Sequence, residues 1–237
     1  TPETVMKVLQ TYAQHLPADP FDLEETDRRL ETTLRGNPSA RAALSAAMHD
    51  LVGKRLGVPV YKLWGLDPAK APMSTFTIGI DTPERIRMKV QEAAEYPILK
   101  IKLGSDRDLE ILQTIRDATD RELRVDANCG WTVKHTIQML PVLEEFGVTV
   151  LEQPLVPTDV EGLGVIRMAA SIPIIADESC RTASDIPGLV GQVDGINIKL
   201  AKCGSLREAI RMISVARAHH MTVMVGCMIE SSLAITA

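Results

Sequence analysis

The sequence predicts an α/β protein with a (β/α)8-type barrel that is incomplete at its C-terminus and preceded by a helical region. Apolar segments of strand length end in charged residues at Asp126, Glu152, Asp177 and Lys202, which are 26, 25 and 25 residues apart. Segments with the apolar spacing of helices lie between them. Because a strand, a helix and their turns occupy about this length of chain, the repeat favours a parallel sheet that curls into a barrel.

Residues 1–71 show helical patterns without strands that end in charged residues, so we expect them to form a separate helical region. The segment Asn37-Pro38-Ser39 is typical of a helix start, and Gly57 is expected to end that helix. Residues 72–237 are expected to form the barrel. Its strands are expected at residues 73–78, 98–103, 123–126, 148–152, 174–177, 196–202 and 222–225.

These segments supply seven strands, whereas a closed barrel of this type has eight. An open sheet of seven strands would leave its first and last strands unpaired, an exposure that closed barrels avoid. We therefore expect the last barrel strand and its flanking helices to be absent from this chain.

The second expected strand carries two lysines among apolar residues. Side chains alternate between the two faces of a strand, so Lys100 and Lys102 point to one face and their apolar neighbours to the other. Two cations on one face of a buried strand require anions, water or chemistry at that face. An edge strand on which lysines prevent aggregation is the alternative interpretation.

Asp126, Glu152 and Asp177 are expected to end strands three, four and five. The carboxyl ends of the strands converge on the active site in barrels of this type. Three carboxylates held together repel one another unless a cation lies among them, and an all-oxygen ligand set favours a hard ion, Mg²⁺ before Mn²⁺ or Ca²⁺. Three unrelated acids that pair with lysines or cap helices are the alternative. We expect a Mg²⁺ site.

Strands two and six face each other across an eight-stranded ring, so Lys102 and Lys202 are expected on opposite sides of the metal site. One lysine could then remove the α-proton of a metal-bound substrate carboxylate and the other return it to the opposite face, a 1,1-proton transfer through a metal-stabilised enediolate. A divalent cation and Lys100 would lower the pKa of the base from its usual value of about 10.4. On strand six, alternation places Asn197 and Lys199 on the interior face, whereas the repeat spacing favours Lys202 as the acid–base residue.

Six short segments carry a family resemblance, which extends from about residue 39 to the end of the chain. They are Lys100-Ile-Lys102, Asp126-Ala-Asn-Cys-Gly-Trp131, Glu152-Gln-Pro154, Asp177-Glu-Ser179, Asn197-Ile-Lys-Leu-Ala-Lys-Cys-Gly204 and Gly226-Cys-Met-Ile-Glu-Ser231. Together they resemble the enolase superfamily in its muconate-lactonising branch, and most closely the dipeptide epimerases.

The resemblance implies a Mg²⁺-dependent isomerase that inverts one α-carbon of a dipeptide. The three strand-end carboxylates would be the metal ligands, and Lys102 and Lys202 the acid–base pair. In dipeptide epimerases the Gly-Cys-Met-x-Glu-Ser segment lies near the bound dipeptide. Residues 39–65 look like the end of an α+β capping domain. The residues expected at the substrate are Lys100, Asn128, Cys227, Met228 and Glu230, with helix capping as an equal alternative for Asn128.

The chain also departs from the family pattern. Gly204 is followed by Ser205, where the family often has a second glycine. The Asp-x-Asp pair that holds the substrate ammonium in dipeptide epimerases lies on the last barrel strand, beyond this chain, and the N-terminal capping strands are not seen. Other reactions of the branch are therefore alternatives: muconate cycloisomerisation, o-succinylbenzoate synthesis and N-acylamino-acid racemisation. A further alternative is that the chain is a catalytically inactive scaffold subunit.

The composition narrows the class of partner. The 237 residues are 45% hydrophobic and 24% charged, which is ordinary for a globular protein. A net charge of −5 without a run of lysines and arginines argues against nucleic acid, and no apolar stretch approaches the roughly 18 residues of a membrane span. The first residues show no secretory signal. We expect a cytoplasmic homo-oligomer that acts on a small molecule.

Four cysteines each follow soon after the end of an expected strand. Reduced thiols are the expectation for a cytoplasmic protein. A zinc site at the barrel mouth is the alternative, although the spacings match no structural zinc pattern. The four are Cys129, Cys180, Cys203 and Cys227.

Overall fold

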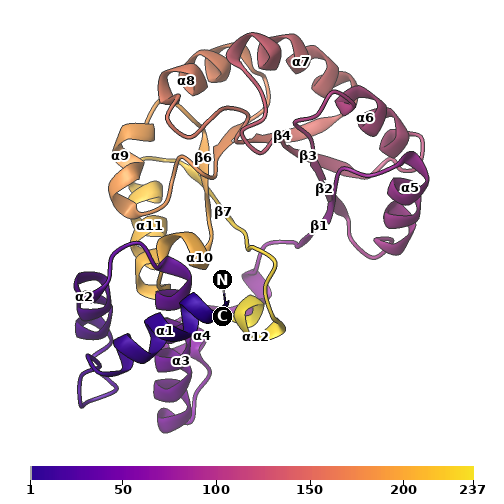
Figure 1. Ribbon diagram of the computed structural model, residues 1–237. Helices are drawn as coiled ribbons and strands as arrows, with labels where there is room; N and C mark the ends of the chain where they lie inside the picture. Colours follow the sequence, from indigo (N-terminus) through magenta and orange to yellow (C-terminus); the bar gives the residue numbers. More distant parts are fainter. Residues whose placement is uncertain (1) are drawn as a thin grey trace.

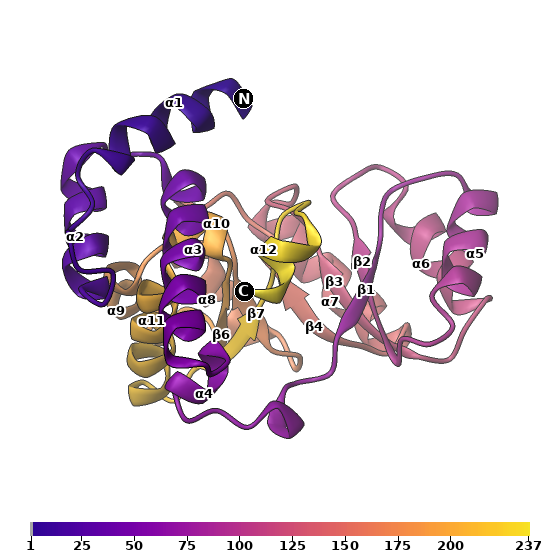
Figure 2. The ribbon, with the colours of Figure 1, turned by 90° about the horizontal axis from the view of Figure 1, so that it is seen from below.

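The computed structural model describes residues 2–237, in which a helical N-terminal part leads into a curved sheet surrounded by helices (Figures 1 and 2). The N-terminal elements are α1 (Pro2–Ala13), α2 (Leu23–Thr33), α3 (Pro38–Leu56), α4 (Val60–Leu63) and the short 3-10 helix η1 (Pro68–Lys70). The strands are β1 (Thr75–Ile78), β2 (Ile98–Lys102), β3 (Glu122–Asp126), β4 (Val148–Glu152), β5 (Ile174–Ala176), β6 (Gly195–Ile198) and β7 (Thr222–Val225). The helices among and after them are α5 (Pro83–Glu92), α6 (Asp108–Arg116), α7 (Val133–Glu145), α8 (Val160–Ala169), η2 (Ala183–Asp185), α9 (Ile186–Leu189), α10 (Leu200–Cys203), α11 (Leu206–Ala218) and α12 (Ser232–Thr236).

The N-terminal helices form a small core of their own. Tyr12 is fully buried between the helices, and its hydroxyl donates a hydrogen bond to Leu34 O. The longest helix, α3, starts with Pro38 in its first turn and ends at Gly57, whose φ of 68° is in the left-handed region that glycine adopts freely. This helix packs on α10 and α11 and thereby attaches the helical part to one flank of the sheet.

All seven strands are parallel and follow their sequence order, from β1 at one edge to β7 at the other. Helices α5 to α8 and α11 lie outside the curve, as Figure 1 shows. Apolar residues from the strands and from these helices form one continuous buried core. The architecture is an incomplete (β/α)8 barrel, which confirms the predicted fold class. No helix among residues 2–237 combines the length and the apolar character that a membrane span requires.

The strand register brings the charged strand ends into one layer. Lys102 pairs with Asp126 between β2 and β3, and Asp126 pairs with Glu152 between β3 and β4. Both carboxylates end their strands, as the sequence predicted. The 25-residue repeat therefore reflects a real structural repeat on this side of the barrel.

The sixth strand differs from the prediction. It ends at Ile198, and the residues expected to continue it form the short helix α10 instead. Gly204, with a φ of 90°, ends this helix with its N–H bonded to Leu200 O. Lys202 therefore lies on a helical turn, whereas Lys199 directly follows the strand. On β5, the regular strand ends at Ala176, one residue before Asp177.

Candidate metal and acid–base centre

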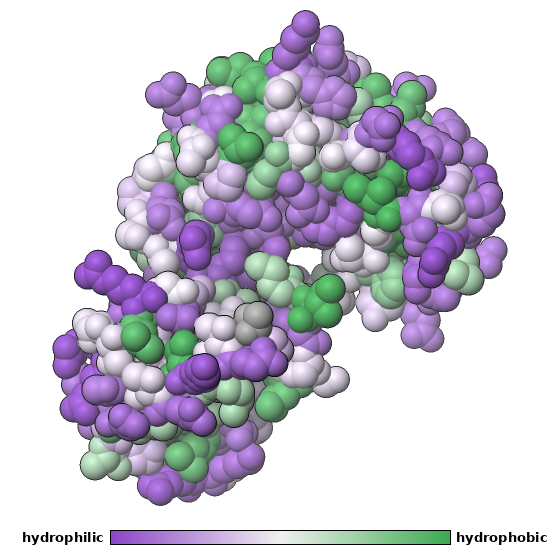
Figure 3. Space-filling model, viewed as in Figure 1, coloured by the Kyte–Doolittle hydropathy of each residue, from purple (hydrophilic) through white to green (hydrophobic). Residues whose placement is uncertain are grey.

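Three carboxylates meet at the carboxyl ends of β3, β4 and β5. Asp126, Glu152 and Asp177 are 0%, 2% and 0% exposed, and one oxygen from each lies within 4.8 Å of the others. Residue types with a formal charge are rarely buried without a partner or an ion. Figure 3 shows that hydrophilic residues line the inner margin of the curved sheet, where these strand ends lie.

Two lysines of β2 contact one end of this cluster. Lys102 Nζ donates a hydrogen bond of 2.6 Å to Asp126 Oδ2. Lys100 Nζ lies 2.9 Å from the same oxygen and 2.6 Å from Glu152 Oε2, so it bridges two carboxylates. Lys100 and Lys102 share a strand face, as alternation predicts, and that face meets anions.

Residues of β6 and α10 contact the other end of the cluster. Lys199 Nζ donates a hydrogen bond to Asp177 Oδ2. Asn197 Nδ2 donates a hydrogen bond of 2.8 Å to Glu152 Oε1. Lys202 Nζ lies 2.5 Å from Asp177 Oδ1 and donates to main-chain carbonyl oxygens. The two strands thus bring cations to the cluster from opposite sides.

Burial and neighbouring charge shift the pKa values of the carboxyls in opposite directions. Burial raises the pKa of Glu152 to about 7, and the negative charge of Asp126 adds to this against the opposing effect of Lys100. Burial also acts to raise the pKa of Asp126, but Lys100 and Lys102 outweigh it and hold that pKa below its usual value.

The pKa values of Asp177 and Lys100 also reflect burial opposed by neighbouring charges. Burial acts to raise the pKa of Asp177, but the cations Lys202 and Lys199 outweigh it and keep the carboxyl ionised. Burial acts to lower the pKa of Lys100, but Glu152 and Asp126 outweigh it, so its pKa is raised. The positive charge of Lys100 is therefore stabilised between these two carboxylates.

The donor set fits a hard divalent cation. All three carboxylates offer oxygen, which Mg²⁺ prefers. A further buried oxygen beside the cluster, Asn197 Oδ1, lacks a hydrogen-bond partner among residues 2–237. Unpaired buried oxygens are rare in folded proteins and are commonly satisfied by an ion or water.

Of the predicted substrate residues outside the cluster, Asn128, Cys227 and Met228 are exposed and Glu230 is half-buried. Asn128 is exposed with a φ of 45°, and its main-chain N–H donates a hydrogen bond of 2.9 Å to Asp126 Oδ1. Cys227 and Met228 are exposed in the loop after β7, and Glu230 Oε1 accepts a hydrogen bond of 3.0 Å from Met228 N within that loop. Their contact with substrate stays a prediction.

Gln153 supports the site in a way that the sequence analysis missed. Its side chain is fully buried, and Oε1 accepts hydrogen bonds from Asp177 N (2.8 Å) and Ser179 N (3.1 Å). Its φ of 35° is unusual for a residue with a side chain. The available signals were its position directly after the strand-end Glu152 and its place in the Glu152-Gln-Pro154 segment.

Two family models, one for each domain, match most of the chain. The model described as "Mandelate racemase / muconate lactonizing enzyme, N-terminal domain" matches residues 1–65, and the model described as "Enolase C-terminal domain-like" matches residues 84–237. The chain belongs to the mandelate racemase/muconate lactonizing enzyme family. This places it in the enolase superfamily and confirms the resemblance drawn from the six motifs.

Relatives within this family include several proteins named as epimerases. The L-Ala-D/L-Glu epimerase of Bacteroides thetaiotaomicron is 44% identical over 100% of this chain and 62% of that protein. The hydrophobic dipeptide epimerase of Enterococcus faecalis is 35% identical over 92% of this chain and 64% of that protein. The chain thus spans less than two thirds of the length of these family members.

Solved structures of family members superpose closely. The dipeptide epimerase of Enterococcus faecalis complexed with Mg and the dipeptide L-Leu-L-Tyr has a TM-score of 0.94 at 33% identity, covering 100% of this chain and 70% of that one. The dipeptide epimerase of Cytophaga hutchinsonii complexed with Mg and D-Ala-L-Val has a TM-score of 0.92 at 30% identity, covering 99% and 66%.

Proposed function

We propose that this chain carries the active centre of a Mg²⁺-dependent dipeptide epimerase, an isomerase that inverts one α-carbon of a dipeptide. The observation that carries the proposal is the approach of Lys102 and Lys199 to opposite ends of one carboxylate cluster, from β2 and β6. The names of the related proteins support dipeptides as the substrate class.

The three carboxylates would hold the metal in this proposal. When bound, a divalent cation supplies positive charge that stabilises the negative charge developing on the substrate carboxylate as the α-proton leaves. Asn197 holds one oxygen of Glu152, and Lys100 bridges Glu152 and Asp126, so both side chains orient the ligands. Such outer contacts are typical of metal sites.

Lys199 suits the second acid–base role better than Lys202, which the repeat spacing favoured. The ammonium of Lys202 is buried and directs hydrogen bonds to three main-chain carbonyl oxygens, which leaves it no free donor for a substrate. Lys199 contacts only a carboxylate side chain, Asp177 Oδ2, among the hydrogen bonds of its ammonium described in residues 2–237. We therefore assign the acid–base pair to Lys102 and Lys199.

The pair would work by two proton transfers at one carbon. The neutral amine of Lys102 takes the α-proton from one face of one epimer, and the ammonium of Lys199 gives a proton to the opposite face. The reverse reaction exchanges the two roles. Inversion therefore needs both lysines, while loss and return of a proton on one face needs only one.

The experiment is incubation of the protein with L-Ala-L-Glu and with a panel of hydrophobic dipeptides, in D₂O with Mg²⁺, followed by ¹H NMR. We expect the α-proton signal of one residue to disappear as the other epimer forms, and chelation of the metal to stop both changes. Binding of Mg²⁺ without exchange on any dipeptide would contradict the proposal. Turnover of a muconate, an o-succinylbenzoate precursor or an N-acylamino acid instead would assign another reaction of the same branch.

The proposed setting is a cytoplasmic homo-oligomer. All four cysteines are free thiols, which is usual for a reducing compartment. Light scattering coupled to size-exclusion chromatography measures the oligomeric state directly, and a monomer would contradict this part of the proposal.

A further inference from the structure

Lys202 makes an unusual set of contacts for a lysine beside a candidate metal site. Its ammonium is buried, with 8% of the residue exposed, and donates hydrogen bonds to the main-chain oxygens of Asp177, of Cys180 (2.9 Å) and of Asn197 (2.8 Å). An ammonium has three N–H donors, so all three are used, and the ammonium also lies 2.5 Å from Asp177 Oδ1. One side chain therefore ties together the end of β5, the loop that follows it and strand β6.

The sheet itself does not hold Asp177. The pairing of β4 with β5 ends at Glu152 and Ile175, and that of β5 with β6 ends at Ala176 and Ile196. Beyond these pairs, the main-chain N–H of Asp177 donates to the side chain of Gln153, and its carbonyl oxygen accepts from Lys202 and, in a local turn, from the N–H of Cys180 at 3.1 Å. Side chains thus replace the ladder hydrogen bonds at the point where the carboxylate enters the cluster.

We propose that Lys202 is the positioning residue for Asp177, and that it sets this carboxylate for the metal without touching the substrate. The inference rests on the proposed metal site. The same ammonium holds the carbonyl oxygen of Asn197, two residues before Lys199, so it also fixes the strand that presents the proposed acid–base group. A tetrahedral ammonium directs its three donors from a single nitrogen atom, whereas an arginine spreads its donors over three nitrogens in one plane, so the two groups do not fit the same set of oxygens.

The test is calorimetric titration of the full chain with Mg²⁺ in wild type, Lys202→Arg and Lys202→Met. Lys202→Arg keeps the positive charge and changes the size and geometry of the donor group. We expect both variants to bind Mg²⁺ about ten- to hundredfold more weakly, the range for loss of a contact that orients a metal ligand. If Lys202 only competed with the metal for Asp177, Lys202→Met would remove a repelling charge and Mg²⁺ would bind more tightly. Unchanged or tighter binding in both variants would overturn the proposal.

Arg121→Met is the matched control for general loss of stability. The guanidinium of Arg121 also donates to three main-chain oxygens, those of Val90, Ala93 and Tyr96, but lies at the opposite ends of the strands from the cluster. We expect this variant to lower the melting temperature and leave the Mg²⁺ affinity of the folded protein unchanged. Equal weakening in Arg121→Met and Lys202→Arg would reduce Lys202 to a structural role.

Two further readouts separate the inference from the proposed function. Hydrogen–deuterium exchange of the amides of residues 177–180 is expected to accelerate in Lys202→Arg and to stay unchanged in Arg121→Met, a result that does not depend on bound metal. Unchanged exchange in Lys202→Arg would overturn the proposal. If wild type does not bind Mg²⁺, both the metal site and the inference are refuted. If Glu152→Gln loses Mg²⁺ binding while Lys202→Arg binds it normally, the inference alone is refuted.

Discussion

Lys102 and Asp126 are direct partners in the register of β2 and β3, and their side chains form a hydrogen bond of 2.6 Å. The two residues end their strands in the same layer of the barrel. Parallel pairing therefore delivers a cation and a carboxylate to one point without any contribution from loops. On the far side of the cluster, Lys199 and Asp177 form the equivalent contact from β6 and the end of β5.

Glu152→Gln is expected to weaken Mg²⁺ binding by at least about tenfold, the lower end of the loss seen even for residues outside the ligand shell. The substitution removes one charged oxygen ligand and keeps the size of the side chain. Glu122→Gln is the matched control, because Glu122 lies at the start of β3, away from the cluster. Calorimetry that gives equal Mg²⁺ affinities for Glu152→Gln and wild type would contradict the assignment of the metal site.

Trp131→Phe is expected to lower the free energy of unfolding by about 1–3 kcal/mol, the usual cost of losing a hydrogen bond to a buried charged group. Trp131 Nε1 donates a hydrogen bond of 2.8 Å to Asp108 Oδ2. Asp108 also accepts hydrogen bonds from the main-chain N–H groups of Gly104 and Ser105, in the loop after Lys102. The substitution thus loosens the loop that follows the proposed base. Urea denaturation measures the change.

Trp64→Phe serves as the control for that experiment. Trp64 packs edge-on against His49, and its indole N–H makes no hydrogen bond within residues 2–237. We expect a smaller loss of stability than for Trp131→Phe. An equal or greater loss would mean that the ring volume of Trp131, rather than its hydrogen bond, accounts for the effect.

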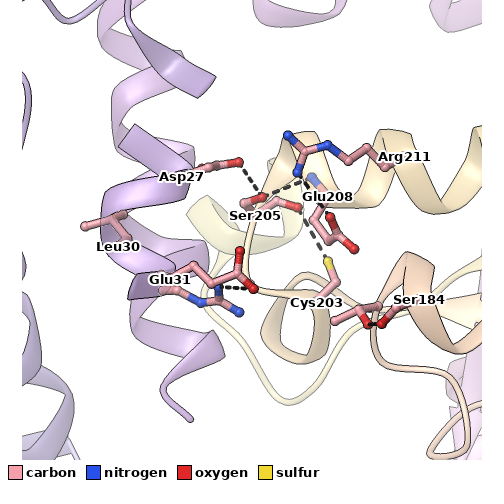
Figure 4. Close-up of a pocket in the computed structure, with 11 residues that line it drawn as sticks. Asp27, Leu30, Glu31, Ser184, Cys203, Ser205, Glu208 and Arg211 are labelled. Atoms are coloured by element: carbon pink, nitrogen blue, oxygen red, sulfur yellow. Dashed lines mark hydrogen bonds and ion pairs between the residues drawn. The ribbon is translucent and has the colours of Figure 1, made fainter. Parts of the chain in front are cut away.

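Asp27→Asn is expected to stabilise the protein at neutral pH. Asp27 on α2 accepts a hydrogen bond of 2.7 Å from Ser205 Oγ across the pocket of about 220 Å³ between α2 and the start of α11 (Figure 4). Burial raises its pKa above the ordinary value of 3.8, against the opposing hydrogen bond from Ser205. An asparagine keeps an oxygen for Ser205 and carries no charge to bury.

The sign of the pH dependence follows from that shift. A raised pKa in the folded state means that folding favours protonated Asp27, so its contribution to stability is full below pH 3.8 and is lost as the pH rises through the folded-state value. We expect the stability difference between Asp27→Asn and wild type to grow over this window and then level off. Thermal unfolding at a series of pH values measures it, and a constant difference from pH 3 to pH 7 would contradict the shift.

The spacing in the sequence predicted the carboxylate cluster because residues one strand–helix repeat apart occupy equivalent positions at the ends of neighbouring strands. Asp126 and Glu152 end their strands as expected, and Asp177 follows the end of β5 by one residue. The same count placed a strand end at Lys202, but β6 ends at Ile198 and Lys202 lies on a helical turn. Alternation along the strand placed Lys199 on the interior face, and its ammonium contacts Asp177.

The long-range hydrogen bonds of the site could not be predicted from the sequence. Gln153 and Lys202 hold Asp177 through main-chain atoms, and nothing in their residue types or spacing indicates these partners. The hydrogen bond from Trp131 to Asp108 joins a loop to the start of α6, 23 residues away in the sequence. Contacts of this kind depend on the exact ends of strands, which residue patterns locate only within a few positions.

The central claim is that Lys102 and Lys199 act on opposite faces of one α-carbon, and hydrogen exchange in the single mutants tests it most directly. Lys102→Met and Lys199→Met are each expected to abolish epimerisation, because inversion needs a group that removes the proton and another that donates it. Each mutant keeps one lysine and should exchange the α-proton of only one epimer with D₂O, the two mutants showing opposite preference by ¹H NMR. Full epimerase activity in either mutant, or the same epimer preference in both, would contradict the account.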